Sequence, residues 1–159
     1  IALTAAERGE DAPLILGGGP VAYNPAPFAA FFDALCIGEG EEAFAELLTT
    51  LREAKRAGLS RAVRLKALAQ IEGLSVPALT RGTVQRRVLA DFANYPVVTT
   101  PVVPFVETSQ DRLSIEIMRG CARGCRFCAA GMLNRPVRER SAHTIVAAAT
   151  QGLALTGLN

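Results

Sequence analysis

Three of the four cysteines in this 159-residue chain fall within eight consecutive positions. The stretch RGCARGCRFCAAG, residues 119–131, contains Cys121, Cys125 and Cys128. Clustered cysteines in a chain without a visible secretory signal usually bind a metal or take part in redox chemistry, because reducing compartments keep thiols free. The spacing therefore raises the question of which group is held by three thiolates rather than four.

Two other interpretations of the cysteine spacing stay open. On a helix the three side chains would share one face, where small buried cysteines are common. Gly120 and Gly124 disfavour that helix, since a glycine in a helix interior costs roughly 1 kcal/mol relative to alanine. A structural zinc site prefers four ligands. The fourth would have to come from Cys36 or His143, which lie outside the cysteine stretch.

An iron–sulfur cluster with three protein ligands agrees better with the cysteine count. Cysteine thiolates bind such clusters one per iron. With three thiolates one iron keeps an open site, as a catalytic zinc does. Glycines would let the backbone fold closely around the cluster and direct N–H groups at its sulfur atoms. We expect Arg119, Arg123 and Arg126 to stabilise the reduced, more negative cluster.

Positive charge is concentrated around the cysteines. Residues 111–140 contain seven arginines and three acidic residues, a balance of +4, whereas residues 1–110 contain 10 basic and 12 acidic residues, a balance of −2. A local excess of this kind suits an anionic cofactor or substrate, or a nucleic acid. A solvated basic loop is the plainer alternative.

The elements that precede the cysteines alternate between apolar runs and helical stretches. Residues 14–16 and 34–37 are short apolar runs that each end at glycine, and residues 24–33 have helical character. Residues 39–58 have the strongest helical pattern, with acidic residues at the start and basic residues at the end. This strand–turn–helix alternation predicts a parallel α/β sheet with ligands at the carboxyl ends of its strands.

The rest of the chain divides into a connecting segment and a second set of elements. Residues 60–73 predict a basic helix, and the proline-containing stretch that follows is typical of short extended pieces. Residues 112–120 alternate like a strand that enters the cysteine loop. Ser141 can cap a helix that follows the loop. We therefore expect the order strand, cysteine loop, helix.

The motif Cys121-x3-Cys125-x2-Cys128, with Phe127 before the last cysteine, resembles the signature loop of the radical S-adenosylmethionine (radical SAM) superfamily. The resemblance implies a 4Fe–4S cluster held by the three cysteines, with S-adenosylmethionine chelated to the open iron. It implies reductive cleavage of that cofactor to a 5′-deoxyadenosyl radical. It further implies that Phe127 lies beside the cluster and the adenine, and that an electron donor such as flavodoxin or ferredoxin reduces the cluster.

The stretch LGGGPVAYNPAPFAAFFDALCIGEGEEAFAEL resembles the last third of the cobalamin-binding, Rossmann-like domain that precedes many radical SAM barrels. The resemblance implies that two glycine turns border the nucleotide tail of a cobalamin. Their residues are Gly17, Gly18, Gly19, Gly38 and Gly40. Any βα junction also requires such turns. Together with the cysteine loop, the resemblance extends to an uncharacterised B12-binding-domain-containing radical SAM subgroup, often encoded with a small radical-SAM-associated partner protein.

We thus expect an α/β fragment in three parts. Residues 1–58 would be the C-terminal part of a B12-binding-like Rossmann domain, 59–110 a linker, and 111–159 the first βα unit of a partial (β/α) radical SAM barrel. We expect a cytoplasmic enzyme without a membrane segment, whose remaining S-adenosylmethionine contacts lie past Asn159. Cobalamin-assisted methyl transfer, methylthiolation of RNA or protein, and a non-catalytic metal-binding interaction module remain alternatives. The sequence does not name the substrate.

Overall fold

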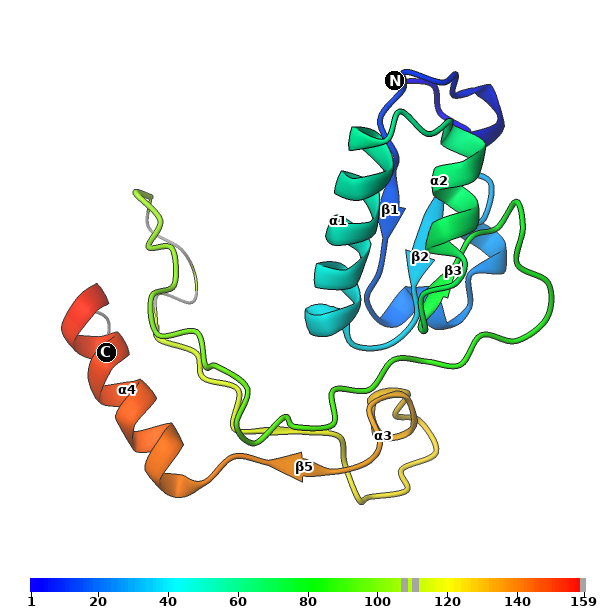
Figure 1. The fold of residues 1–159 in the computed structure, drawn as a ribbon. Helices are drawn as coiled ribbons and strands as arrows, with labels where there is room; N and C mark the ends of the chain where they lie inside the picture. The colour runs from blue at the N-terminus through cyan, green and yellow to red at the C-terminus, as the bar shows by residue number, and fades with distance from the viewer. Residues whose placement is uncertain (107–108, 110–111, 158–159) are drawn as a thin grey trace. The chain divides into compact units, whose positions relative to one another are not determined.

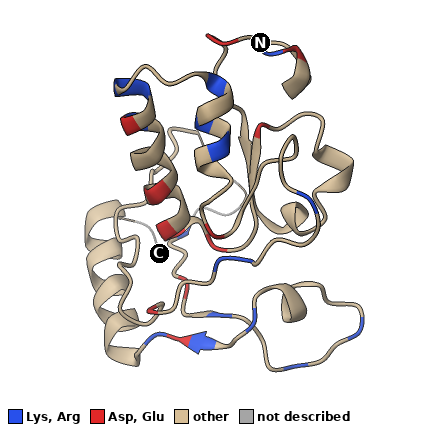
Figure 2. Ribbon diagram, turned by 45° about the vertical axis from the view of Figure 1, so that its right-hand side comes forward, with Lys and Arg blue, Asp and Glu red and all other residues tan. Residues whose placement is uncertain are grey.

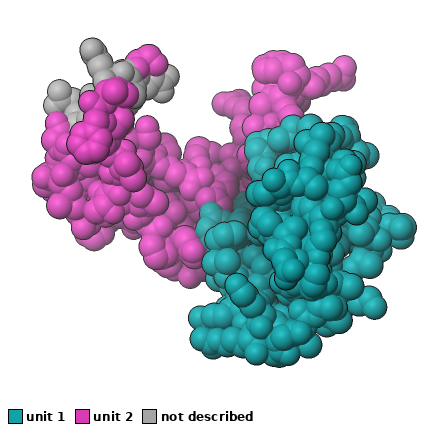
Figure 3. All heavy atoms as spheres, turned by 90° about the horizontal axis from the view of Figure 1, so that it is seen from above, with its two compact units in different colours: residues 1–89 teal, residues 90–159 magenta. Residues whose placement is uncertain are grey.

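The computed structural model describes residues 1–106, 109 and 112–157 and divides into two compact units. Unit 1 comprises Ile1–Leu89 and unit 2 Ala90–Asn159 (Figure 3). This boundary falls inside the segment 59–110 that we expected to be a linker. Asp111 and Asn159, the expected limits of the barrel part, lie outside the described residues.

Unit 1 contains a three-stranded sheet in the order β1-β2-β3. β1 (Leu16–Gly17) runs parallel to β2 (Ala34–Cys36), and β3 (Leu74–Ser75) pairs with β2 in the antiparallel direction. The parallel pair and the mixture of helices and strands agree with the α/β fold expected from the sequence. β3 adds a strand from the segment that we expected to be a linker.

Two helices lie together on one side of this sheet (Figure 1). They are α1 (Gly40–Arg56) and α2 (Arg61–Leu68), and they pack against each other. Acidic residues begin α1 and basic residues end it (Figure 2), as the helix dipole favours. Gly58 follows α1 with a φ of +64°, a left-handed conformation that suits glycine at a helix end. α1 and α2 thus confirm the helices expected over residues 39–58 and 60–73.

The helical character expected for residues 24–33 appears only as short 3-10 turns. These are η2 (Pro20–Tyr23) and η3 (Ala26–Phe28); a similar turn, η1 (Ala5–Glu7), lies near the N-terminus. Pro25 and Pro27 explain the difference, because proline has no N–H to donate and clashes with the carbonyl one turn earlier in an α-helix.

The core of unit 1 lies on both faces of β2. Ala34 belongs to a buried cluster with Leu47 of α1 and Leu68 of α2. The next residue, Leu35, belongs to a second cluster with Ala22 and Ile37. Successive side chains of a strand point to opposite faces. The uninterrupted apolar run 34–37 is therefore buried from both sides, as in the central strand of an α/β sheet.

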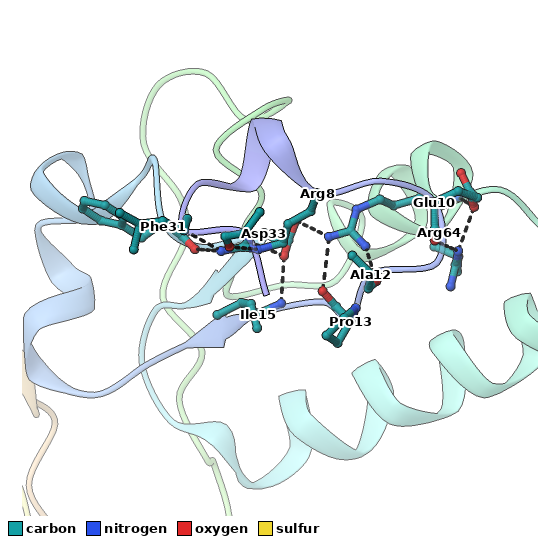
Figure 4. A network of polar contacts seen from close by, with 11 residues as sticks. Arg8, Glu10, Ala12, Pro13, Ile15, Phe31, Asp33 and Arg64 are labelled. Atoms are coloured by element: carbon teal, nitrogen blue, oxygen red, sulfur yellow. Dashed lines mark hydrogen bonds and ion pairs between the residues drawn. The ribbon is translucent and has the colours of Figure 1, made fainter.

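Just before β2, the buried carboxylate of Asp33 joins three segments of unit 1 (Figure 4). Its two oxygens accept hydrogen bonds from Arg8 Nη1 and Arg61 Nη2, each at 2.7 Å, and the N–H of Ile15 donates to it at 2.8 Å. The arginines also donate to backbone carbonyls, including those of Phe31 and Ala12. The Asp33 carboxylate thereby connects the segments that carry Arg8, Ile15 and Arg61.

A segment of extended chain around Arg87, which we call the strap, lies against the carboxyl end of β2. The N–H of Arg87 donates to the carbonyl of Ile37 at 2.9 Å, and its carbonyl accepts from the N–H of Glu39 at 3.0 Å. The Arg87 guanidinium forms ion pairs with Glu42 and Glu46 on α1. Gly38, with a φ of +107°, lies directly under this strap.

Unit 2 contains β4 (Met118–Arg119), α3 (Ala130–Leu133), β5 (Arg138–Glu139) and α4 (Ala142–Thr156). The strand expected over 112–120 is reduced to β4. A strand needs a hydrogen-bonded partner and, among the described residues, β4 pairs only with the two-residue β5.

The expected helix after Ser141 is confirmed, with the Ser141 hydroxyl accepting from the N–H of Thr144 at 3.1 Å. In the described part of the chain, no helix is long and apolar enough to cross a membrane.

Replacing Asp33 should destabilise unit 1 strongly. In Asp33→Asn two buried guanidiniums lose their counter-charge, and breaking a buried ion pair in this way costs about 3–5 kcal/mol. Urea unfolding followed by circular dichroism measures the loss. Asp11→Asn, the same change at an exposed carboxylate, should leave the unfolding midpoint almost unchanged. Equal stability of both variants would contradict the central role of Asp33.

Gly38 should tolerate no side chain. A Cβ at this position would lie 2.2 Å from the Arg87 carbonyl oxygen, and its positive φ is unfavourable for L-residues. We expect Gly38→Ala to lower the free energy of unfolding by at least about 2 kcal/mol. Gly40→Ala is the matched control, since a Cβ added there would meet nothing within 4 Å and alanine favours helices. An equally stable Gly38→Ala variant would show that the strap does not need this glycine.

Candidate metal centre

The three clustered cysteines lie in one loop that β4 and β5 close at its base. Met118 pairs with Glu139, and Arg119 pairs with Arg138, in an antiparallel ladder. The loop between these strands contains all three cysteines and the short helix α3, and basic residues recur along it (Figure 2). The order expected from the sequence, strand then cysteine loop then helix, thus holds in outline, but a second short strand intervenes before α4.

The loop keeps its cysteines accessible. Cys125 is exposed, Cys121 and Cys128 are partly buried, and none of the three forms a disulfide. The N–H of Arg123 donates to Cys121 Sγ at 3.4 Å, and the N–H of Cys128 donates to the carbonyl of Cys125 at 3.1 Å. Backbone N–H groups directed at sulfur are among the features that tune iron–sulfur clusters.

Glycine allows the two ends of the loop to approach each other. Gly120 has a φ of +86°, and a Cβ there would lie 2.6 Å from the carbonyl oxygens of Asn134 and Pro136. Gly131 in α3 similarly approaches the Arg123 carbonyl. Gly124, in contrast, has open space around it, so close packing does not require a glycine there. The glycines therefore shape the loop at its base and at α3.

The donor set fits an iron–sulfur cluster by its chemistry. Three thiols without other covalent partners lie in one accessible loop, which is the ligand type that such clusters use. Among the described residues, however, no group of three or more histidine, cysteine or acidic side chains is arranged to hold a metal ion. Binding would therefore draw the three sulfur atoms together within the loop.

The other two candidate ligands lie elsewhere. Cys36 is in β2 of unit 1, and the pKa of its thiol is raised by burial and, to a smaller extent, by the charge of Glu41. His143 is exposed in the first turn of α4. Cys36 thus belongs to unit 1 and His143 to α4, whereas the three clustered cysteines share one loop of unit 2.

Phe127 projects from the cysteine loop with 92 % of its surface exposed. Arg123 and Arg126 beside it are also exposed. An exposed aromatic ring next to cationic side chains is available for contact with a ligand. Because so much of its surface is exposed, the Phe127 ring contributes little to packing among the described residues.

The glycines expected to border a cobalamin are partly filled by the chain itself. A Cβ at Gly17 would lie 2.6 Å from Leu35 and 2.9 Å from Phe32, and at Gly38 the Arg87 backbone takes the space. The remaining three positions, Gly18, Gly19 and Gly40, have no contact closer than 3.7 Å. Gly17 and Gly38 thus allow close packing of the chain at these two positions.

A small cavity does lie at the carboxyl ends of β1 and β2. Its volume is about 250 Å³, and apolar residues around Gly17, Gly18 and Cys36 line it almost entirely. Pockets for cofactors are usually larger and carry several directed polar groups. This cavity therefore gives no support for the nucleotide tail of a cobalamin at this edge.

One group near the cysteine loop had no signal in the sequence. The ring of Phe92 is completely buried, and three guanidiniums lie over it, those of Arg119 at 4.8 Å, Arg138 at 5.8 Å and Arg140 at 4.3 Å from its centre. We call these four residues the Phe92 cluster. Phe92 lies in a proline-containing stretch far from the cysteines in sequence, so no periodicity connects it with them.

Comparison with known proteins gives one relationship. Residues 1–77 match the family model described as "Radical SAM proteins, N-terminal". No curated protein and no solved structure gave a significant match. The match ends at residue 77, before the cysteine loop. The family match and the cysteine motif are therefore separate observations on different residues. Over just under half of its length, the chain is therefore similar to the N-terminal part of radical SAM proteins.

Proposed function

We propose that this chain is part of a radical SAM enzyme in which Cys121, Cys125 and Cys128 hold a 4Fe–4S cluster. One observation carries the proposal: a radical SAM N-terminal match over residues 1–77 and a three-cysteine loop at 121–128 occur in the same chain without overlapping. Each feature indicates the same chemistry from different residues.

The number of ligands explains what the cluster would do. Three thiolates leave one iron open for the amino and carboxylate groups of S-adenosylmethionine. Held by Cys121, Cys125 and Cys128, a reduced cluster would supply the electron for cleavage of the sulfonium C–S bond of S-adenosylmethionine to methionine and a 5′-deoxyadenosyl radical, which would take hydrogen from a substrate. The reducing electron would come from a donor such as flavodoxin or ferredoxin.

The residues of the loop have distinct roles in this proposal. The exposed ring of Phe127 would contact the adenine of S-adenosylmethionine. The exposed guanidiniums of Arg123 and Arg126 would favour the more negative, reduced state of the cluster. The N–H of Arg123, already directed at Cys121 Sγ, would stay a hydrogen-bond donor to a ligating sulfur. Residues 111–159 would form the start of the radical SAM barrel.

The reaction that follows radical formation has two candidates. Cobalamin-assisted methyl transfer would require a corrinoid, and the filled positions at Gly17 and Gly38 do not favour one at the described sheet edge. Methylthiolation of RNA or protein would use the excess positive charge of residues 111–140 to hold an anionic partner. A bound corrinoid in the full-length protein indicates the first reaction, whereas salt-sensitive tRNA binding without a corrinoid indicates the second.

The three loop cysteines should each be required for the cluster. After anaerobic reconstitution of the full-length protein, Cys121→Ser, Cys125→Ser and Cys128→Ser should each lose most of the bound iron, because each thiolate ligates one iron. Cys36→Ser is the matched control and should retain it, since that thiol packs against the core of unit 1. Iron and sulfide analysis measures the difference.

Electron paramagnetic resonance then tests the open site. The spectrum of the reduced cluster should change when S-adenosylmethionine is added, and 5′-deoxyadenosine should accumulate. Iron loss in Cys36→Ser alone would contradict the ligand assignment. Zinc without iron in the anaerobically purified protein would indicate a non-catalytic metal-binding interaction module. A spectrum of the reduced cluster that does not change with S-adenosylmethionine would contradict the proposed cleavage of this cofactor.

A further inference from the structure

Another cavity of unit 1 lies on the face of the sheet opposite α1 and α2. Its volume is about 420 Å³, and the residues that line it include Tyr23, Ile37, Ser75, Thr83, Val84 and Gln85. Ile37 follows the last residue of β2, so the cavity is near the carboxyl end of that strand. Ligands of α/β proteins commonly bind outside the carboxyl ends of parallel strands. We call this space the Ser75 cavity.

The register of β3 directs the side chain of Ser75 toward this cavity. Ser75 lies directly opposite Leu35 in the antiparallel ladder, and directly opposite residues project to the same face of a sheet. Leu35 packs with Ile37 and Val84, both of which line the cavity. The neighbouring Leu74 belongs to the cluster on the other face, under the helices. The Ser75 hydroxyl therefore lies on the cavity side of the sheet.

Ser75 is a buried polar residue whose hydroxyl the fold itself does not use. Only 6 % of its surface is exposed. Its backbone belongs to β3, but its hydroxyl forms no hydrogen bond with any residue that the structure describes. Buried side-chain hydroxyls in native proteins normally have a hydrogen-bond partner. A buried, unpaired hydroxyl that faces a cavity therefore indicates a ligand in that cavity.

The polar groups of the Ser75 cavity indicate which ligand chemistry it suits. Thr83 and Gln85 line it with exposed side chains. A hydroxyl both donates and accepts hydrogen bonds, and a carboxamide offers a donor beside an acceptor. These groups match ligand hydroxyls, which also donate and accept, better than a carboxylate, which only accepts, or an ammonium, which only donates. Tyr23 and Arg86 line the cavity as well, and both already interact within the chain.

We propose that the Ser75 cavity binds a small, neutral, hydroxylated molecule of about the size of a monosaccharide. Ser75 would hydrogen-bond to a hydroxyl at the buried end, and Thr83 and Gln85 to hydroxyls at the open end. Ile37 and Val84 would contact the C–H surface of the ligand. A few directed polar groups on an otherwise apolar wall are typical of small-molecule sites. The site involves no cysteine and goes beyond the proposed function.

Titration of the isotope-labelled 159-residue chain with glucose and with ribose, followed by nuclear magnetic resonance, tests the site. At least one sugar should shift the amide signals of Ser75, Val84 and Gln85. Ser75→Ala and Gln85→Ala should each raise the Kd of that sugar about fivefold, because each removes one hydrogen bond between neutral groups. Gln70→Ala is the matched control and should leave the Kd unchanged, since Gln70 is an exposed residue of unit 1 outside the cavity.

Gln85→Ala keeps the test decisive if a change at the buried Ser75 impairs folding, because the Gln85 side chain is exposed. Unchanged amide signals with both sugars, or the same Kd in the wild type and in Gln85→Ala, would overturn the site. Benzoate serves as an anionic probe. Binding of benzoate that is lost in Arg86→Gln, without binding of either sugar, would overturn the neutral ligand. None of these measurements involves iron, so they leave the proposed function untouched whichever way they fall.

Discussion

The carboxylate of Asp33 is the interaction on which unit 1 most depends. The unit is small, its strands are two or three residues long, and its buried apolar clusters contain few residues. Such a sheet gains little from backbone pairing alone. Asp33 compensates by joining the N-terminal turn, through Arg8, to the start of α2, through Arg61, at the point where β2 begins. A buried charge is tolerated there because its partners are in place.

Both units use a charged group in a buried setting, but in opposite ways. In unit 1 one carboxylate is surrounded by guanidiniums, so the pairing of opposite charges stabilises the contact. In unit 2 three guanidiniums lie over the uncharged ring of Phe92. The first arrangement serves the stability of the fold. The second brings side chains from both strands at the base of the cysteine loop onto one buried ring.

The glycines of the chain show why the same sequence signal has different meanings. Gly38 and Gly120 both have a positive φ and both meet a neighbouring backbone where a Cβ would lie. In unit 1 the neighbour is the strap at Arg87, so the turn that resembled a cofactor border serves chain packing. In unit 2 the neighbours are Asn134 and Pro136, so the glycine closes the base of the cysteine loop. A glycine in a sequence indicates a conformational need without naming the partner.

The local features of this chain could be predicted from its sequence. The spacing of Cys121, Cys125 and Cys128, the helix at 40–56 and the cap at Ser141 depend on neighbouring residues, and patterns of three or four positions reveal them. Features made by distant residues became visible only in the folded chain. These are the antiparallel β3, the reduction of the strand at 112–120 to two residues, the strap over Gly38, and the contact of Phe92 with three arginines. Such contacts depend on which segments the folded chain brings together, and no periodicity in the sequence records that choice.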